Sequence, residues 1–318
     1  MRGQNNCIGL TSILIPASVT EIVGSWSASE TDISKSISWN CPAIITIHPE
    51  NHIFEVEKKT VIKKQIINVS VTLSQRLWLE QALKKAGIKE PAYVSRLTVT
   101  GTFAESDFRY ICENMAETLQ ELELSNASIR KNHIPYPGFS GCTGLISIIL
   151  SETVQSIDRR VFYDCTQLSS IAVHPDNPYY ASDNGVLYNK EKTVLVKYPL
   201  ARKSDYVIPD SVNKIDIEAF CGCTGLATVT FTFHDDSLWT NKWIWWGYGS
   251  TVIIPDTMVE IGQDAFRDCT GLSNVYIPAS VIVIGNSAFE GCSTYFIVHP
   301  DNPNYTSVKG VLFDKTFP

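Results

Sequence analysis

The chain has 318 residues, of which 44% are hydrophobic and 19% charged, a balance typical of an ordered protein. Its formal net charge of −7 comes without a basic stripe, which argues against a nucleic-acid partner. No run of about 18 apolar residues occurs, so we expect no membrane insertion by this sequence.

The first predicted unit runs from Cys7 to Ile22 and reads CIGLTSILIPASVTEI. Its pattern is a cysteine with leucine at +3, apolar residues at +6 and +8, and proline at +9. A unit this short cannot bury both faces of its own strands, so we expect it to stack on copies of itself in a solenoid. A partial second unit begins at Cys41, and the excursion after it is expected to turn near Lys58 and Lys59.

A different pattern occupies residues 66–128, where strand-like and helix-like stretches alternate. Ser74 is a candidate N-cap for a helix, and Gly87 supplies its C-terminal stop. The apolar residues at helical spacing are Leu77, Leu79, Ala82, Leu83 and Ala86. Two short strands follow, VSRLTVTG and LQELELSN, separated by the helix-like segment ESDFRYICENMAE. We expect these strand–helix–strand steps to stack on the short units.

From Cys142 onward the short unit dominates, and its cysteines set the spacing. Cys142 to Cys165 and Cys269 to Cys292 are each 23 residues, and Cys223 to Cys269 is 46, which is two whole units. Cys165 to Cys223 is 58 residues, which is one unit plus an insertion of 35.

The insertion predicts a β-hairpin that leaves the coil. It contains GVLY and TVLVKYP on either side of NKEK, two strand-like runs around a turn. The same sequence recurs near the end of the chain, where residues 299–315 match residues 174–190 at 11 of 17 positions.

Three stretches resemble BspA-like leucine-rich repeats: CTGLSNVYIPASVIVIGNSAFEGC, IIPDTMVEIGQDAFRDC and IPDSVNKIDIEAFCGC. The HPDNP-containing insertion also recurs in that family. The resemblance covers residues 140–318 strongly and 7–64 loosely, while residues 66–128 are similar to the longer, helix-containing repeat that often precedes such coils.

The resemblance implies a leucine-rich repeat solenoid, mainly of short β coils, with a helix-containing α/β segment in the N-terminal half. We expect three parts: N-terminal coils at 1–65, the helix-containing segment at 66–128, and the main solenoid at 129–318 with hairpin insertions at 174–200 and 299–318. The family further implies a surface or secreted protein of host-associated bacteria, with adhesion or host-protein binding and no catalysis.

The chain has nine cysteines, and most of them share one column of the repeat. The column contains Cys7, Cys142, Cys165, Cys223, Cys269 and Cys292, and Cys41 is expected to join it. Cys112 and Cys221 lie outside it. Such a column favours buried unpaired thiols, although adjacent coils would also allow disulfides. No CxxC or histidine-flanked zinc spacing occurs, so we expect no metal site.

Alternation along the first strand of each unit points the +3, +6 and +8 residues inward and the +5 and +7 residues outward. The +5 column is small and polar, and the +7 column is partly apolar, with Ile149, Ile253 and Tyr276 among its members. This uncharged face suits contact with a protein or glycan, and these three residues are candidate binding residues. Hydroxyl ladders that only stabilise the stack explain the +5 column equally well.

The histidines predict no metal site and no catalytic site. His48, His174 and His299 all precede proline at matching points of the repeat, and a turn with Asx capping explains this pattern better than calcium or zinc. GxSxG, HExxH, Walker and GxGxxG motifs are absent from the sequence. We therefore expect no enzyme and no cofactor.

Four tryptophans crowd the stretch SLWTNKWIWWGYGS. The cysteine missing from the 46-residue interval should stand at Trp246, and Trp243 then takes the column of the phenylalanines. We expect Trp243 and Trp246 in the core. Trp239 and Trp245 fall in outward columns and, with Tyr248, predict an exposed aromatic contact patch.

The sequence therefore predicts a non-enzymatic binding or adhesion module that presents a solenoid face to a host or extracellular protein or glycan. The expected location is the cell surface or the extracellular space, although the residues after Met1 contain no apolar signal core and would also suit a cytosolic protein. The alternative is a structural spacer whose activity lies in segments outside this sequence.

Overall fold

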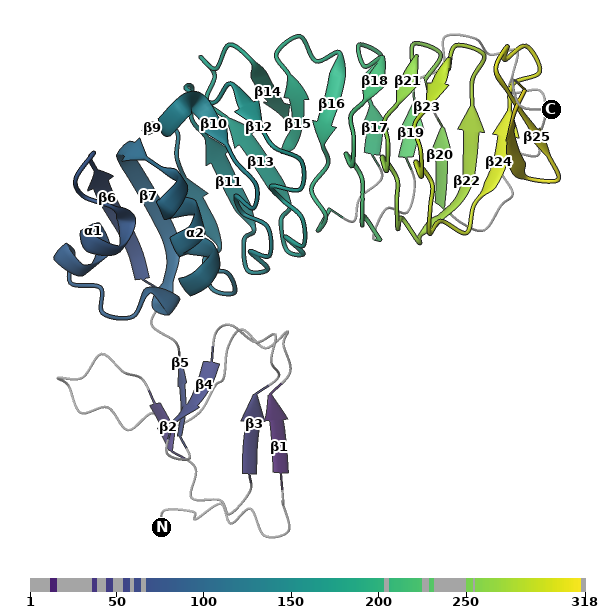
Figure 1. Cartoon of the computed structure of the whole chain (residues 1–318). Coiled ribbons are helices and arrows are strands. Elements are labelled where there is room, and N and C mark those ends of the chain that lie inside the picture. Colours follow the sequence, from purple (N-terminus) through teal and green to yellow (C-terminus); the bar gives the residue numbers. More distant parts are fainter. Residues whose placement is uncertain are drawn as a thin grey trace. The chain divides into compact units, whose positions relative to one another are not determined.

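The structure, a computed structural model, describes residues 67–202, 206–224 and 255–315, and elsewhere only the backbone of the strands named below. The chain forms two compact units, Met1–Ile67 and Asn68–Pro318 (Figure 1). In the described part, no helix has the length and apolar character needed to cross a membrane.

The first unit contains a parallel pair and a small antiparallel sheet. β1 (Ser12–Ile15) pairs in parallel with β3 (Ile44–Ile47), as expected for two stacked coils. In the small sheet, β5 (Thr60–Lys63) lies between β2 (Ser36–Ser38) and β4 (Phe54–Glu57). β4 and β5 are antiparallel, which confirms the predicted reversal of the chain between them.

The second unit begins with a six-stranded sheet that joins the helix-containing segment to the short coils. Its strands in chain order are β6 (Ile67–Leu73), β7 (Val94–Phe103), β8 (Glu121–Glu123), β9 (Ala127–Ile129), β11 (Ser147–Leu150) and β13 (Ser170–Val173). Leu97 lies opposite Leu122, which in turn lies opposite Ile148, so one apolar column runs through both kinds of repeat. The expected stacking of the two repeat types is confirmed.

Two helices cover this part of the core, α1 (Leu79–Lys85) and α2 (Glu105–Asn114), with short 3-10 turns at Pro91–Tyr93 and Arg130–Asn132. The predicted cap of α1 was wrong. Ser74 instead forms a β-bridge with Leu77, and the first turn of α1 is capped from α2. The buried carboxylate of Asp107 accepts the N–H of Leu79 and that of Ala104, each at 2.8 Å. Burial raises the pKa of Asp107, and the two N–H donors oppose that shift.

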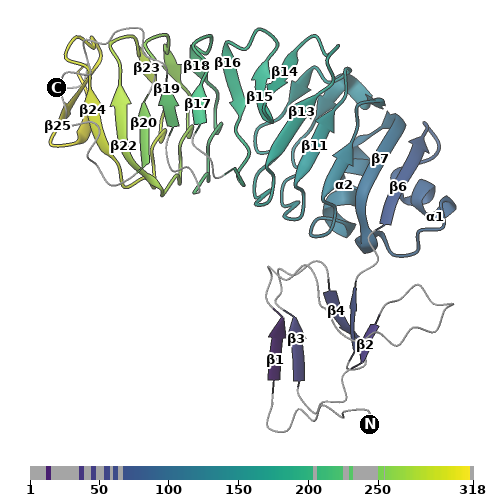
Figure 2. The same ribbon diagram turned by 180° about the vertical axis from the view of Figure 1, so that it is seen from behind.

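The rest of the second unit is a stack of coils with two strand rows (Figures 1 and 2). One row consists of β17 (Tyr206–Ile208), β19 (Val229–Phe231), β20 (Ser250–Ile253), β22 (Leu272–Ile277) and β24 (Tyr295–Val298), all parallel. The other row has short strands, namely β10 (His133–Ile134), β12 (Ser156–Ile157), β16 (Val194–Lys197), β18 (Lys214–Ile215), β21 (Glu260–Ile261) and β23 (Val283–Ile284).

The predicted inward columns are confirmed. In the coil that starts at Cys142, the inward residues Leu145, Ile148 and Leu150 are buried, whereas the outward Ser147 and Ile149 are only half-buried. This alternation lets each coil bury its apolar side chains against the coils above and below it.

The cysteine column is a column of free thiols, as favoured from the sequence. All seven cysteines in the described part are unpaired. Thiols of the column donate to carbonyls of the preceding coil; for example, Cys269 Sγ lies 3.1 Å from the Phe220 oxygen and Cys292 Sγ lies 3.0 Å from the Phe266 oxygen. Cys112 does not stand apart from the column as predicted, because its Sγ lies 3.6 Å from that of Cys142.

The two predicted hairpin insertions are alike in structure. The first contains β14 (Tyr180–Asp183) and β15 (Val186–Asn189), and the second β25 (Tyr305–Val308) and β26 (Val311–Asp314). β15 also pairs antiparallel with β16, so the predicted GVLY–TVLV hairpin is confirmed, while β14 was missed.

A buried asparagine fastens each insertion to the coil before it. Asn177 donates to the carbonyls of Ser151 and Val154 at 2.9 Å each, and its oxygen accepts two N–H groups of its own turn. Asn302 makes the same set of contacts in the second copy. The Asx turn inferred from the histidine–proline motif is therefore confirmed.

Candidate functional site

Neighbouring coils are joined at one corner by a regular set of backbone hydrogen bonds, here called the corner ladder. The N–H groups of Glu218, Phe220 and Gly222 donate to the carbonyls of Gln263, Ala265 and Arg267 at 3.0, 2.8 and 2.8 Å. The next coil repeats the pattern: Asp264, Phe266 and Asp268 donate to Asn286, Ala288 and Glu290. Alternate residues of these two corners therefore donate to the corner stacked on them, and the first pair of corners is adjacent although the chain passes through β19 between them.

The corner ladder breaks where the 35-residue insertion enters. The chain leaves the stack after β13, forms β14 and β15, and returns along β16, which pairs with β18 of the next coil. Tyr198, just after β16, donates to the Ala219 carbonyl of the next coil. The amides of Arg160, Phe162 and Asp164, at the donor positions of the preceding corner, have no hydrogen-bond partner among the residues that the structure describes.

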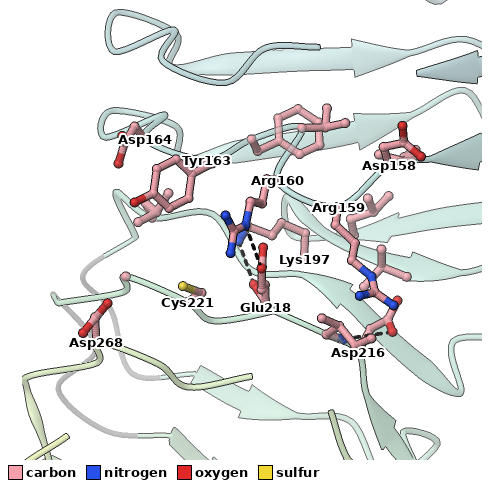
Figure 3. A pocket seen from close by; sticks show the side chains of 18 of the residues that line it. Asp158, Arg159, Arg160, Tyr163, Asp164, Lys197, Asp216, Glu218, Cys221 and Asp268 are labelled. Carbon is pink, nitrogen blue, oxygen red and sulfur yellow. Dashed lines mark hydrogen bonds and ion pairs between the residues drawn. The ribbon is translucent and has the colours of Figure 1, made fainter. Parts of the chain in front are cut away.

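A cleft of about 530 Å³, here called the corner cleft, opens at this break. Figure 3 shows Tyr163 and Asp164 on one wall and Glu218 and Cys221 on the facing wall. The walls come from the coils on either side of the insertion, and Leu187, Val196 and Leu200 of the insertion also line it.

One ion pair crosses the cleft. Arg160 Nε lies 3.0 Å from Glu218 Oε1, and Lys197 Nζ donates to the Glu218 carbonyl oxygen at 2.8 Å (Figure 3). Glu218 is buried, with 9% of its surface exposed, so this pair is partly shielded from water. The Arg160 and Lys197 side chains therefore supply contacts to Glu218 at the place where the backbone bonds of the corner ladder are broken.

The charge of the cleft is mixed and net negative. Its cations are Arg159, Arg160 and Lys197, and its acids are Asp158, Asp164, Asp216, Glu218 and Asp268. Three positive against five negative groups leave a balance of −2. Asp164 is exposed and has no ion-pair partner among the described residues, whereas Asp268 pairs with Arg267 at 3.6 Å.

The thiol in the cleft is not set up for catalysis. Burial raises the pKa of Cys221, so the thiol is protonated at neutral pH and weakly nucleophilic. Among the described residues that line the cleft, none is a histidine that could serve as its base.

Most of the predicted binding residues lie outside the described part of the chain, so the structure does not place them relative to the corner cleft. Trp239, Trp245 and Tyr248 lie outside the described residues, as do Trp243 and Trp246 and the side chain of Ile253. The pairing of β20 with β22 does place Ile253 opposite Tyr276, so these two share the predicted outward column.

Ile149 and Tyr276 are half-buried and stand in different sheets, so the structure does not bring them together. Burial raises the pKa of Tyr276 to about 12, and its hydroxyl oxygen is buried without a hydrogen-bond partner in the described part of the chain. Neither residue lines the corner cleft. Their role in binding stays a prediction.

The corner cleft itself was missed in the sequence. The 58-residue interval from Cys165 to Cys223 locates the insertion, and this signal could have found the break. It does not say which backbone amides beside the insertion have no acceptor among the described residues.

One group of possible metal ligands occurs in the described residues, formed by Glu152, His174 and Asp176, whose ligand atoms lie within 4.8 Å of one another. His174 Nδ1 already accepts the N–H of Asp176 at 3.2 Å, which closes the turn of the insertion. This contact explains the histidine without a metal.

Three solved structures are similar to this chain at low identity. A leucine-rich repeat protein from Eubacterium ventriosum is 18% identical, with a TM-score of 0.39 over 75% of this chain and 70% of its own. The pneumococcal vaccine antigen PcpA is 15% identical, with a TM-score of 0.42 over 82% and 57%. A leucine rich cell surface protein from Faecalibacterium prausnitzii is 15% identical, with a TM-score of 0.30 over 79% and 87%.

No curated protein matches the sequence. A family model described as a BspA type leucine rich repeat region matches residues 105–192 and 201–316 with 6 copies, which is more than half of the chain. Together with the coils, columns and strand rows described above, this match identifies the chain as a member of the BspA-type leucine-rich repeat family.

Proposed function

We propose that this chain is a non-enzymatic binding module of a surface or secreted protein, and that the corner cleft is its contact site for an extracellular protein or glycan. One observation carries the proposal: among the described residues, three neighbouring backbone donors of the cleft have no partner, whereas the same positions of the corners at 218–222 and 264–268 are all paired. Unpaired backbone groups in a folded protein call for a partner, which is water or a ligand.

The rim of the cleft supports a binding role. Tyr163 is 46% exposed, and the Arg160 guanidinium lies 5.9 Å from the centre of its ring. Exposed tyrosine and arginine side chains are the types that most often anchor protein contacts. The location at or outside the cell surface is supported by membership in the BspA-type family.

A structural spacer is the second candidate, and one observation favours it. Arg160 and Lys197 already bridge the cleft through Glu218, so the break is stable without a ligand. In that case, the cleft is only the seam at which the insertion was accommodated.

An array of extracellular-matrix proteins and glycans, probed with the whole chain, separates the two. The double variant Arg159→Ala/Tyr163→Ala removes two exposed side chains from the cleft, and Tyr136→Ala removes an exposed tyrosine outside it as a control. We expect binding to at least one array member, a loss of about ten-fold or more in the double variant, and no change in the control.

Thermal unfolding of all three proteins checks that the variants fold equally well. If the unmodified chain binds no member of the array, the structural spacer is favoured. Equal binding by the double variant would place the contact on another surface.

A further inference from the structure

We propose that the corner cleft binds a basic segment of a polypeptide. In this arrangement, backbone carbonyls of the segment accept the N–H groups of Arg160, Phe162 and Asp164, and a lysine or arginine of the segment pairs with the Asp164 carboxylate. This inference rests on the binding role proposed above and names the class of ligand.

The spacing of the unpaired donors favours a polypeptide over a glycan. The same three positions in the next corner, those of Glu218, Phe220 and Gly222, donate to carbonyls of alternate residues in one continuous stretch of chain. The acceptors that match this row are therefore the regularly spaced carbonyls of another polypeptide backbone. Adding a chain to an unpaired row of backbone donors is an established mode of peptide recognition. Sugar hydroxyls have no such fixed repeat.

The volume of the cleft suits a segment of a second polypeptide. The cleft beside residues 160–164 has a volume of about 530 Å³, and the insertion residues Leu187, Val196 and Leu200 also line it. This volume lies within the range of about 300–1,000 Å³ that is usual for ligand sites.

The negative charge of the cleft favours basic side chains in that segment. Arg160 and Lys197 are both engaged by Glu218, and the cleft as a whole has two more acids than cations. An acidic ligand would meet net repulsion there, whereas a basic side chain would meet the exposed Asp164 carboxylate beside the last unpaired amide.

The test uses two synthetic peptides, one of alternating threonine and lysine and one of alternating threonine and glutamate, each about ten residues long, enough to span a strand-length contact. Both present the regularly spaced carbonyls of a polypeptide backbone, and they differ only in charge. Binding to the whole chain is measured by fluorescence anisotropy at physiological salt, where long-range attraction is screened. Backbone amide NMR signals report which residues are contacted.

We expect the lysine peptide to bind and the glutamate peptide not to bind. The amide signals of Arg160, Phe162 and Asp164 should shift, and their hydrogen exchange should slow, while the already paired amides of Phe220 and Gly222 should change little. Slower exchange is the direct sign that these N–H groups have gained acceptors.

The variant Asp164→Asn isolates the charge. Asp164 has φ of 56°, a left-handed conformation that asparagine also tolerates, so the fold and the amide should be retained. We expect affinity for the lysine peptide to fall about ten-fold or more. Asp176→Asn, which changes an exposed acid outside the cleft, should leave it unchanged.

Three outcomes would overturn the inference: no binding of either peptide, preference for the glutamate peptide, or lysine-peptide binding that is unaffected by Asp164→Asn and moves none of the three amide signals. The array experiment separates this failure from that of the proposed function. If the chain binds an array member but not the lysine peptide, only the proposed class of ligand is overturned. If it binds neither an array member nor the peptide, the proposed binding role is overturned as well.

Discussion

At the scale of single residues, the cysteines act as hydrogen-bond donors at the corner of each coil. The Cys165 thiol donates to the Phe139 carbonyl at 3.1 Å, and Cys269 and Cys292 repeat this contact further along the stack. Burial raises the pKa of Cys165 to about 12 and likewise that of Cys223 to about 12, so both keep their protons at neutral pH. A small side chain with one proton to donate suits a position that must satisfy a carbonyl in the core.

The exposure of the thiols predicts the order in which they react. Cys112, Cys221 and Cys292 are half-buried, and a hydrogen bond from the Cys142 thiol lowers the pKa of Cys112. These three should react first with a thiol reagent in the native protein, and the buried members of the column only after unfolding. All nine thiols should be titrated in denaturant, since the column positions of Cys7 and Cys41 predict unpaired thiols there too. Disulfide-linked peptides found by mass spectrometry would contradict this prediction.

At the scale of elements, the two hairpins place matching residues in different surroundings. In the first copy, Val186 and Tyr188 belong to the core of the later coils and are fully buried. The matching residues of the second copy, Val311 and Phe313, are 55% and 47% exposed, while Leu312 packs on the preceding core. One sequence pattern therefore has two environments, depending on whether later coils cover it.

This difference predicts unequal effects of the same substitution. Tyr188→Ala should lower the free energy of unfolding by ~3–5 kcal/mol, because it opens a cavity in a packed core. Phe313→Ala should cost less than about 1 kcal/mol, because the lost ring is half in water already. Denaturant unfolding of the two variants checks the comparison. Equal destabilisation would mean that the second hairpin face is covered in solution.

How far the sequence predicts the structure also differs from element to element. Spacing located the inward columns and both hairpins, because a solenoid repeats local rules. It was wrong for the 46-residue interval from Cys223 to Cys269, which was predicted to hold two whole units, because Phe220 stacks directly on Phe266 and leaves one corner step between them. The cap of α1 was missed, since Asp107 is 28 residues from Leu79 and only tertiary packing brings them together. The corner cleft was missed for a similar reason: its donors are backbone groups, and no side-chain pattern records which backbone groups remain unpaired. The tryptophan patch at Trp239 and Trp245 stays a prediction.

At the scale of the second unit, aromatic rings run along the corner in two separate columns. Phe220 stacks on Phe266 with ring centres 4.8 Å apart, and Tyr198 stacks on Phe220 at 5.0 Å. Phe139 and Phe162 form the earlier column at 5.8 Å. Phe162 belongs to the earlier column and Tyr198 to the later one, and the break in the corner ladder lies between these two residues.

Two coincident interruptions in a stack have a mechanical consequence. At the intact corners described above, three backbone hydrogen bonds share the load along the stack. At the corner cleft, the walls are joined instead by the Arg160–Glu218 ion pair and by the hydrogen bond from Lys197 to the Glu218 carbonyl. Separating such a corner stretches few bonds, so we expect it to yield first when the second unit is pulled from its ends. In single-molecule force measurements, Arg160→Ala should lower the force of the first extension step and leave later steps unchanged. An unaltered first step would locate the weakest joint elsewhere. The seam would then be the most compliant joint of the second unit.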